Sequence, residues 1–174
     1  MKHDNVLLDI GIGLLAGFVA TKVTEYAQQA LWAATPEKTR KREQRVRPGP
    51  PFRVAAEKSS KLAGLDLDEQ ETKVVGKTFH YASGIGWGPV YCLLRRSFGM
   101  KPLGAGMATG MSMSLILDEF LTPALGFSAP NEDYPAAAHV RGLLGHFVFG
   151  LSVAGTAEGL YRLVPGPAGR NPSN

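Results

Sequence analysis

The chain has 174 residues and a formal net charge of +4, and its single cysteine, Cys92, excludes an intrachain disulfide. Its mean hydropathy of −0.05 is that of a soluble protein, but residues 36–77 hold eleven of the nineteen Lys and Arg residues, and the other segments are rich in Gly, Ala, Leu, Val, Phe and Met. Such segments exclude a uniformly solvated chain, so hydropathy has to be judged window by window.

The first segment, residues 5–34, is predicted to form a membrane helix. It is apolar from Val6 to Ala20 except for Asp9. A helix over residues 5–27 is long enough to cross a hydrocarbon core of about 30 Å. The charge order at its start and the residues after Ala20 do not fit a cleaved signal peptide, so we interpret the segment as a membrane helix.

Residues 35–77 are predicted to form a basic polar loop that contains short amphipathic helices. Prolines interrupt its first half, and acidic residues near position 68 favour the start of a further helix. A basic cluster beside apolar segments favours contact with the anionic lipid headgroups of a bilayer, and we expect no nucleic-acid partner. The cluster consists of Arg40, Lys41, Arg42, Arg45 and Arg47.

Residues 78–164 are predicted to contain three further membrane helices, over 78–98, 102–124 and 136–164. In the first of them, Pro89 beside three glycines predicts a kink or a locally opened helix. The tail at 165–174 is rich in Pro, Gly, Ser and Asn, and we expect it to be disordered. The predicted fold is therefore all-α, an integral membrane bundle of about four transmembrane helices with a basic polar loop after the first.

Each predicted span contains one pair of glycines in a GxxxG pattern. In lipid, helices associate through close backbone approach, so small residues are expected where helices touch. The same pattern leaves open a homo-oligomer or a membrane-protein partner. The predicted packing glycines are Gly13, Gly17, Gly84, Gly88, Gly106, Gly110, Gly155 and Gly159.

Ionisable side chains within the spans are costly there, so each indicates either function or pairing. The neighbours Asp118 and Glu119 point about 100° apart on an α-helix, and we expect only one of them to face the bundle. His139 and His146 are seven residues apart on one helix face. A histidine here is either a hydrogen-bonded core residue or part of a proton relay or pH sensor. The candidate network is Lys22, Glu25, His80, Asp118, Glu119, His146 and Glu158.

Two further readings stay open. Lys22 and Glu25 are three residues apart and can simply pair with each other. A metal site could draw Glu25, His80, Glu119 and His146 from four helices. No helix supplies two ligands at the usual spacing, so we expect no metal and no cofactor. The absence of a catalytic motif favours a protein that is not an enzyme without excluding one. No phosphate-binding loop or dinucleotide motif is present.

The order of these features resembles that of the YagU-like inner-membrane proteins, a family of unknown function. The resemblance covers residues 10–162 and implies a multi-pass helical bundle in the bacterial inner membrane, with a link to survival in acid. It supplies no catalytic residues, and the basic loop departs from the family's first loop. The motifs that carry it are Gly13-Leu-Leu-Ala-Gly17, His80-Tyr81 with Gly84, Gly88 and Tyr91, Asp118-Glu119, Pro123 with Gly126, and Gly145-His146 with Gly150.

The two sources of information on orientation disagree. The side with the basic loop carries eleven Lys and Arg residues outside the spans, and the other side carries six. The positive-inside rule therefore predicts a cytoplasmic loop with both termini outside, whereas the resemblance implies termini inside. For function we expect an envelope or partner-binding membrane protein. The alternatives are a proton-conducting, ion-conducting or pH-sensing protein, and a membrane metalloprotein or enzyme.

Overall fold

The computed structural model describes residues 6–164, and this part of the chain is all-helical, as predicted. Position 5 and the predicted disordered tail lie outside the described residues. Two of the segments are π-helical (η1 and η2), and one is a 3-10 turn (η3). The elements are α1 (Val6–Ala34), α2 (Glu37–Val46), α3 (Pro51–Leu62), α4 (Glu69–Cys92), η1 (Leu93–Ser97), α5 (Pro102–Met113), η2 (Ser114–Leu121), α6 (Thr122–Ala124), η3 (Asn131–Asp133) and α7 (Ala136–Leu163).

Local sequence signals explain where several helices begin and end. At the start of α4, the Asp68 carboxylate accepts a hydrogen bond from the Glu71 amide at 2.8 Å, and the Glu71 carboxylate accepts one from the Asp68 amide at 2.9 Å. This capping box satisfies two backbone donors of the first turn. Pro51 and Pro102 begin α3 and α5, where proline lacks only an N–H that the helix does not use. Gly99, with φ of +67°, reverses the chain between η1 and α5.

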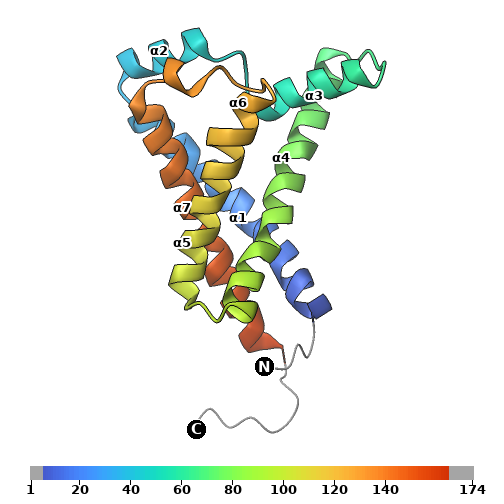
Figure 1. Cartoon of the computed structure of the whole chain (residues 1–174), viewed down its shortest axis with the longest axis vertical. Coiled ribbons are helices and arrows are strands. Elements are labelled where there is room, and N and C mark those ends of the chain that lie inside the picture. Colours follow the sequence, from blue (N-terminus) through green and yellow to red (C-terminus); the bar gives the residue numbers. More distant parts are fainter. Residues whose placement is uncertain (1–5, 165–174) are drawn as a thin grey trace, which may run out of the picture.

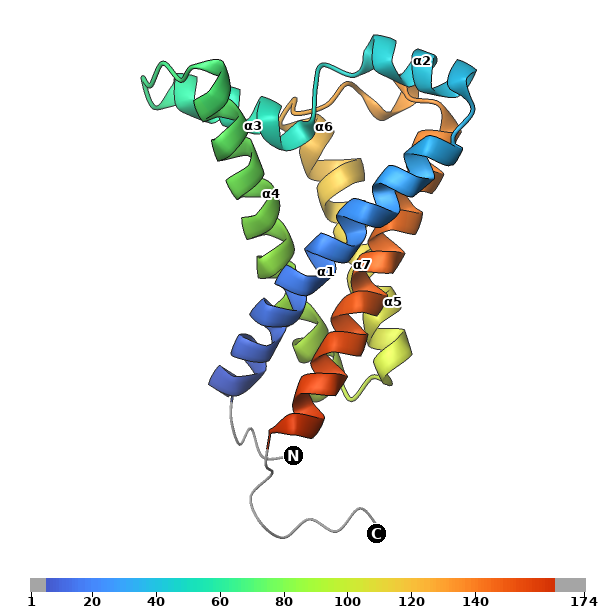
Figure 2. The ribbon, with the colours of Figure 1, turned by 180° about the vertical axis from the view of Figure 1, so that it is seen from behind.

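Four long helical segments run between two ends of the molecule. They are α1, α4, the continuous run α5–η2–α6, and α7 (Figure 1). The first residues of α1 and the last residues of α7 lie at one end, and α2 and α3 lie at the other. Seen from behind, α1 crosses the bundle and packs against both α4 and α7, while α5 packs against α7 (Figure 2). The basic helix α2 therefore lies at one end of the bundle, and the start of α1 and the end of α7 lie at the other.

Glycines allow the two closest helix crossings. A Cβ added at Gly13 would lie 2.6 Å from the Pro89 Cα, and one at Gly17 would lie 2.6 Å from the Gly84 carbonyl oxygen. These clashes show that α1 and α4 touch backbone to backbone, as small residues permit. In the same way, Cβ atoms at Gly84 and Gly88 would meet α1.

At the second crossing, α5 meets α7. A Cβ added at Gly106 would lie 2.8 Å from the Gly150 carbonyl oxygen, and one at Gly110 would overlap the backbone of His146. The prediction that Gly155 and Gly159 form the α7 contact is wrong within this chain, because a Cβ at either position would have no atom within 4 Å. The face of α7 that packs against α5 carries Gly150, and Gly155 and Gly159 are on exposed positions.

Two of the described helices, α1 and α7, are long and apolar enough to cross a membrane. The first part of α4 is polar, and the α5–η2–α6 run is divided among three helical forms. The centre of the bundle is apolar, and its buried residues include Ile12, Ala16, Tyr91, Phe149 and Val153.

Candidate functional site

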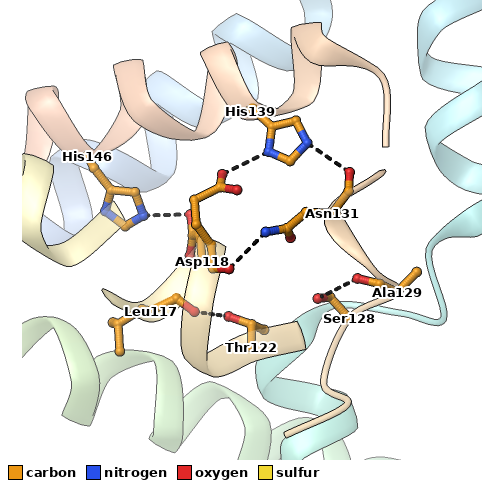
Figure 3. A network of polar contacts seen from close by, with 9 residues as sticks. Leu117, Asp118, Thr122, Ser128, Ala129, Asn131, His139 and His146 are labelled. Carbon is orange, nitrogen blue, oxygen red and sulfur yellow. Dashed lines mark hydrogen bonds and ion pairs between the residues drawn. The ribbon is translucent and has the colours of Figure 1, made fainter. Parts of the chain in front are cut away.

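Two histidines of α7 bind two adjacent carboxylates of η2. His146 Nε2 lies 2.8 Å from Asp118 Oδ2, and His139 Nδ1 lies 2.8 Å from Glu119 Oε1. Figure 3 shows both imidazoles pointing from α7 toward the segment that carries Asp118. The site therefore joins two of the four long segments through two histidine–carboxylate contacts.

The prediction that only one of Asp118 and Glu119 faces the bundle is wrong. The helix is π-helical from Ser114 to Leu121, and a π turn contains more residues than an α turn, so neighbouring side chains diverge less. The two histidines also lie two turns apart along α7, which separates the targets of the two carboxylates. At the end of the π segment, the Thr122 hydroxyl donates to the Leu117 carbonyl (Figure 3).

His139 lies between two hydrogen-bond acceptors. Besides the Glu119 carboxylate at Nδ1, its Nε2 lies 3.1 Å from the backbone carbonyl oxygen of Asn131 (Figure 3). A neutral imidazole has one N–H and can donate to only one of these oxygens, whereas the imidazolium donates to both. The surroundings of His139 are therefore satisfied completely only by its protonated form.

The loop residue Asn131 closes this arrangement. Its side-chain amide donates to the Glu119 backbone carbonyl at 2.8 Å, and its own carbonyl faces His139. The loop between α6 and α7 is thus tied both to the π segment and to α7. Tyr134 adds an edge-to-face contact with the His139 ring, with 6.3 Å between the ring centroids.

A third histidine–carboxylate contact lies between α1 and α4. His80 Nε2 is 3.6 Å from Glu25 Oε1, and the Tyr81 hydroxyl donates to Glu25 Oε2 at 2.8 Å. Lys22 lies 3.7 Å from the same carboxylate, so the Lys22–Glu25 pair is present alongside these contacts. Glu25 therefore links α1 to α4 through two residues of α4, His80 and Tyr81.

Glu158 lies apart from the histidines, at the end of the bundle where α1 begins. Its carboxylate accepts hydrogen bonds from the Arg95 guanidinium at 2.8 Å and from the Tyr91 hydroxyl at 2.9 Å. Nearby, the Tyr161 hydroxyl donates to Asp9 at 2.8 Å. The apolar core lies between this group and the histidine pairs, so Glu158 is separate from the other residues of the predicted network.

The sequence did not predict the buried ion pair between Glu43 and Arg141. Glu43 of α2 is only 3% exposed, and its two carboxylate oxygens lie 2.6 and 2.7 Å from Arg141 Nη2. The Arg141 guanidinium also lies over the Trp32 ring, 4.8 Å from the ring centroid. The sequence does show an acidic residue, Glu43, within a basic helix. Its partner lies on a helix far along the chain, so the sequence alone could not identify it.

The basic cluster lies on α2 and directly after it. Lys41, Arg42, Arg45 and Arg47 are exposed, as expected for residues available to lipid headgroups. Arg40 is partly buried, and its guanidinium lies 5.9 Å from the Trp32 ring centroid. The cluster is thus held at the same end of the molecule as the histidine pairs.

A cavity of about 470 Å³ lies beside these groups. Its walls include two of the contacts described above, Glu43 with Arg141 and Glu119 with His139. Trp32 lines it as well, so the indole reports on the same space that His139 faces.

The four side chains considered for a metal site do not converge. Glu25 is near His80, whereas Glu119 and His146 bind different partners. Within residues 6–164, no group of three or more His, Cys, Asp or Glu side chains is arranged to hold a metal ion.

No family model, curated protein or solved structure matches this chain. The resemblance to the YagU-like proteins therefore stays a prediction.

Proposed function

We propose that this chain is a four-span integral membrane protein that senses pH through His139. The observation that carries the proposal is the position of His139 between the Glu119 carboxylate and the Asn131 carbonyl, two acceptors that only an imidazolium satisfies together. The proton would be bound from the end of the bundle that carries α2 and α3.

Membrane placement is supported by the outer surfaces of the helices. α1 and α7 have the length and composition of spans, and glycine crossings hold α4 and α5 against them. The α5–η2 run adds a row of exposed apolar side chains, including Leu103 at 67% and Phe120 at 66% exposed. A surface of this kind on a water-soluble monomer marks an interaction site or an aggregation hazard, whereas a bilayer covers it.

Protonation of His139 changes the forces between three segments. The imidazolium donates to Glu119 of η2 and to the loop carbonyl of Asn131, so α7, η2 and the loop are held together. A hydrogen bond to a charged group is about twice as strong as a neutral one. Loss of the proton removes the ion pair and one of the two hydrogen bonds, which weakens the attachment of α7 to η2 and the loop.

Four charged side chains besides Glu119 face the same cavity as His139 and contribute to the electrostatic potential at its ring. Glu43, Arg47, Asp118 and Arg141 line the cavity together with His139. Glu43 and Arg141 neutralise each other, and Asp118 is bound to His146. Glu119 is therefore the carboxylate on which the charge of His139 acts directly.

The packing favours sensing over conduction. The buried residues Ala16, Phe149 and Val153 lie between the histidine pairs and the Glu158 group, and each is at most 2% exposed. A proton pathway would need polar groups or water through this apolar core.

By the positive-inside rule the histidine end is cytoplasmic. The resemblance to YagU-like proteins adds the bacterial inner membrane as the location.

Fluorescence of Trp32 tests this proposal. With Trp87→Phe, Trp32 is the only tryptophan, since the chain contains two. We expect its emission in lipid nanodiscs to titrate between about pH 5 and 8, and we expect His139→Gln and Glu119→Gln to abolish that transition. Glu132→Gln, an exposed acid in the same loop region, is the matched control and should titrate like the parent. Identical curves for all four proteins would reject the proposal.

A further inference from the structure

A second and larger cavity, of about 810 Å³, lies between α1, α3, α4, η2 and α7. Figure 1 shows α4 and α5 close together near η1 and separating toward α3 and α6. The cavity occupies this wider part of the bundle, and its volume is within the range of about 300–1,000 Å³ found for small-molecule sites.

The walls of this cavity are mostly apolar, and they carry a group of cations at the end where α3 lies. The apolar lining includes Met113, Leu117 and Phe149. The lining cations are Arg47, Arg53, Lys73 and Lys77.

Carboxylates neutralise only part of this basic rim. Arg53 lies 3.4 Å from Glu57, and Lys73 lies 2.8 Å from Glu69, whose pKa is lowered chiefly by the hydrogen bond from Lys73. Arg47 donates instead to the Gly49 carbonyl at 3.2 Å. Lys77 has no ion pair within the described part of the chain. The rim therefore keeps a net positive charge beside an apolar interior.

We propose that this cavity binds one acyl chain of an anionic phospholipid, with the phosphate at the rim formed by Arg47 and Lys77. The proposal rests on the membrane placement given under Proposed function, but not on the titration of His139. A free phosphate would use the rim and leave the apolar interior unfilled. A neutral lipid would fill the interior and leave the cations unpaired. An anionic lipid satisfies both parts.

Native mass spectrometry of the delipidated full-length protein tests the site. The probes are phosphatidylglycerol and phosphatidylcholine with the same acyl chains. We expect one phosphatidylglycerol to be retained in preference to phosphatidylcholine. Arg47→Gln and Lys77→Gln should each weaken phosphatidylglycerol binding by about fivefold, the effect of one basic residue near an anionic lipid. Lys61→Gln, an exposed lysine of α3 outside the lining, is the matched control.

A second variant tests the apolar interior. Ala82 of α4 lines the cavity, and Ala82→Trp should lower the retention of both lipids. Ala137→Trp, on an exposed position of α7 outside the lining, should not. Equal retention of the two lipids together with no effect of Ala82→Trp would overturn the proposal, and so would retention of oleate without phosphatidylglycerol.

The outcomes separate this inference from the proposed function. If the protein resists alkaline extraction from membranes and Trp32 titrates, but no lipid preference is found, only the lipid site fails. If lipid binding depends on Lys77 while His139→Gln leaves the Trp32 titration unchanged, only the pH response fails. If the protein is released by alkaline extraction, the membrane placement fails and the lipid proposal is rejected with it.

Discussion

Glu43 of α2 accepts two hydrogen bonds from Arg141 of α7, although the two residues are 98 positions apart in the chain. The pair is nearly inaccessible, with side-chain exposures of 4% for Glu43 and 12% for Arg141. Together with the contact of Arg40 with the Trp32 ring, it holds a strongly basic helix against the end of the bundle. The pair thus places one acid of this helix in a buried contact with α7.

We expect Glu43→Ala to release α2 from the bundle. Removing one member of a buried ion pair leaves the other charge unpaired, at a cost of about 3–5 kcal/mol. The basic sites of α2 should then be cleaved by trypsin much faster than in the parent protein. Glu37→Ala removes an exposed acid that pairs with Lys41, and such surface pairs contribute about 0–1 kcal/mol, so its cleavage rate should match that of the parent. Equal protection in Glu43→Ala would show that α2 is held by other contacts.

A second prediction concerns the glycines at the helix crossings. A Cβ at Gly88 would overlap the Gly13 carbonyl oxygen, whereas one at Gly155 would meet nothing within 4 Å. We expect Gly88→Ala to destabilise the protein by about 1–3 kcal/mol through overpacking. Gly155→Ala should be neutral or stabilising by up to about 1 kcal/mol, since alanine is the better helix former. Thermal unfolding in detergent measures both, and equal melting temperatures for the two variants would contradict the close crossing.

The sequence was informative where a local signal determines local structure. Apolar runs predicted an all-helical chain, and the acids around Asp68 indicated the start of a helix that a capping box does begin. It was less informative where a contact depends on which helix face is covered. Gly155 and Gly159 have the same spacing as Gly13 and Gly17, and only the packing distinguishes them.

The candidate site illustrates the same limit. The sequence showed histidines and acids within the predicted spans, where burying an ionisable group is costly. It did not show which residues they contact. The π-helical form of Ser114–Leu121 has no recognisable sequence pattern, and it is what lets both Asp118 and Glu119 reach α7. His139 was noted for its spacing from His146, but the two acceptors that single it out come from the π segment and from a loop.

A third prediction follows from the charge that His139 gains in acid. Its imidazolium forms an ion pair with Glu119, and both side chains are about one-third exposed. Such a partly screened pair contributes about 0.5–1 kcal/mol. We therefore expect the melting temperature to rise as the pH falls from 8 to about 5.5.

The double variant Asp118→Asn, Glu119→Gln is the test of this pH dependence. It keeps hydrogen-bonding side chains on η2 but removes both negative charges, so an imidazolium gains no ion pair there. We expect the rise between pH 8 and 5.5 to disappear in this variant. A rise that persists unchanged would assign the effect to groups other than these two carboxylates and their histidines.

The last prediction concerns the side of the membrane on which each end lies. Arg45 and Arg162 are both exposed, and they lie at opposite ends of the bundle, on α2 and near the end of α7. Cys92 is buried at 2% exposure, and Cys92→Ala provides a background in which only an introduced cysteine reacts. With four spans and a cytoplasmic basic loop, an impermeant maleimide should label Arg162→Cys in intact cells and label Arg45→Cys only after permeabilisation. The reverse pattern would keep the four spans and place the histidine pairs on the outer side. Labelling of both cysteines from the same side would contradict a bundle in which these two ends face opposite compartments.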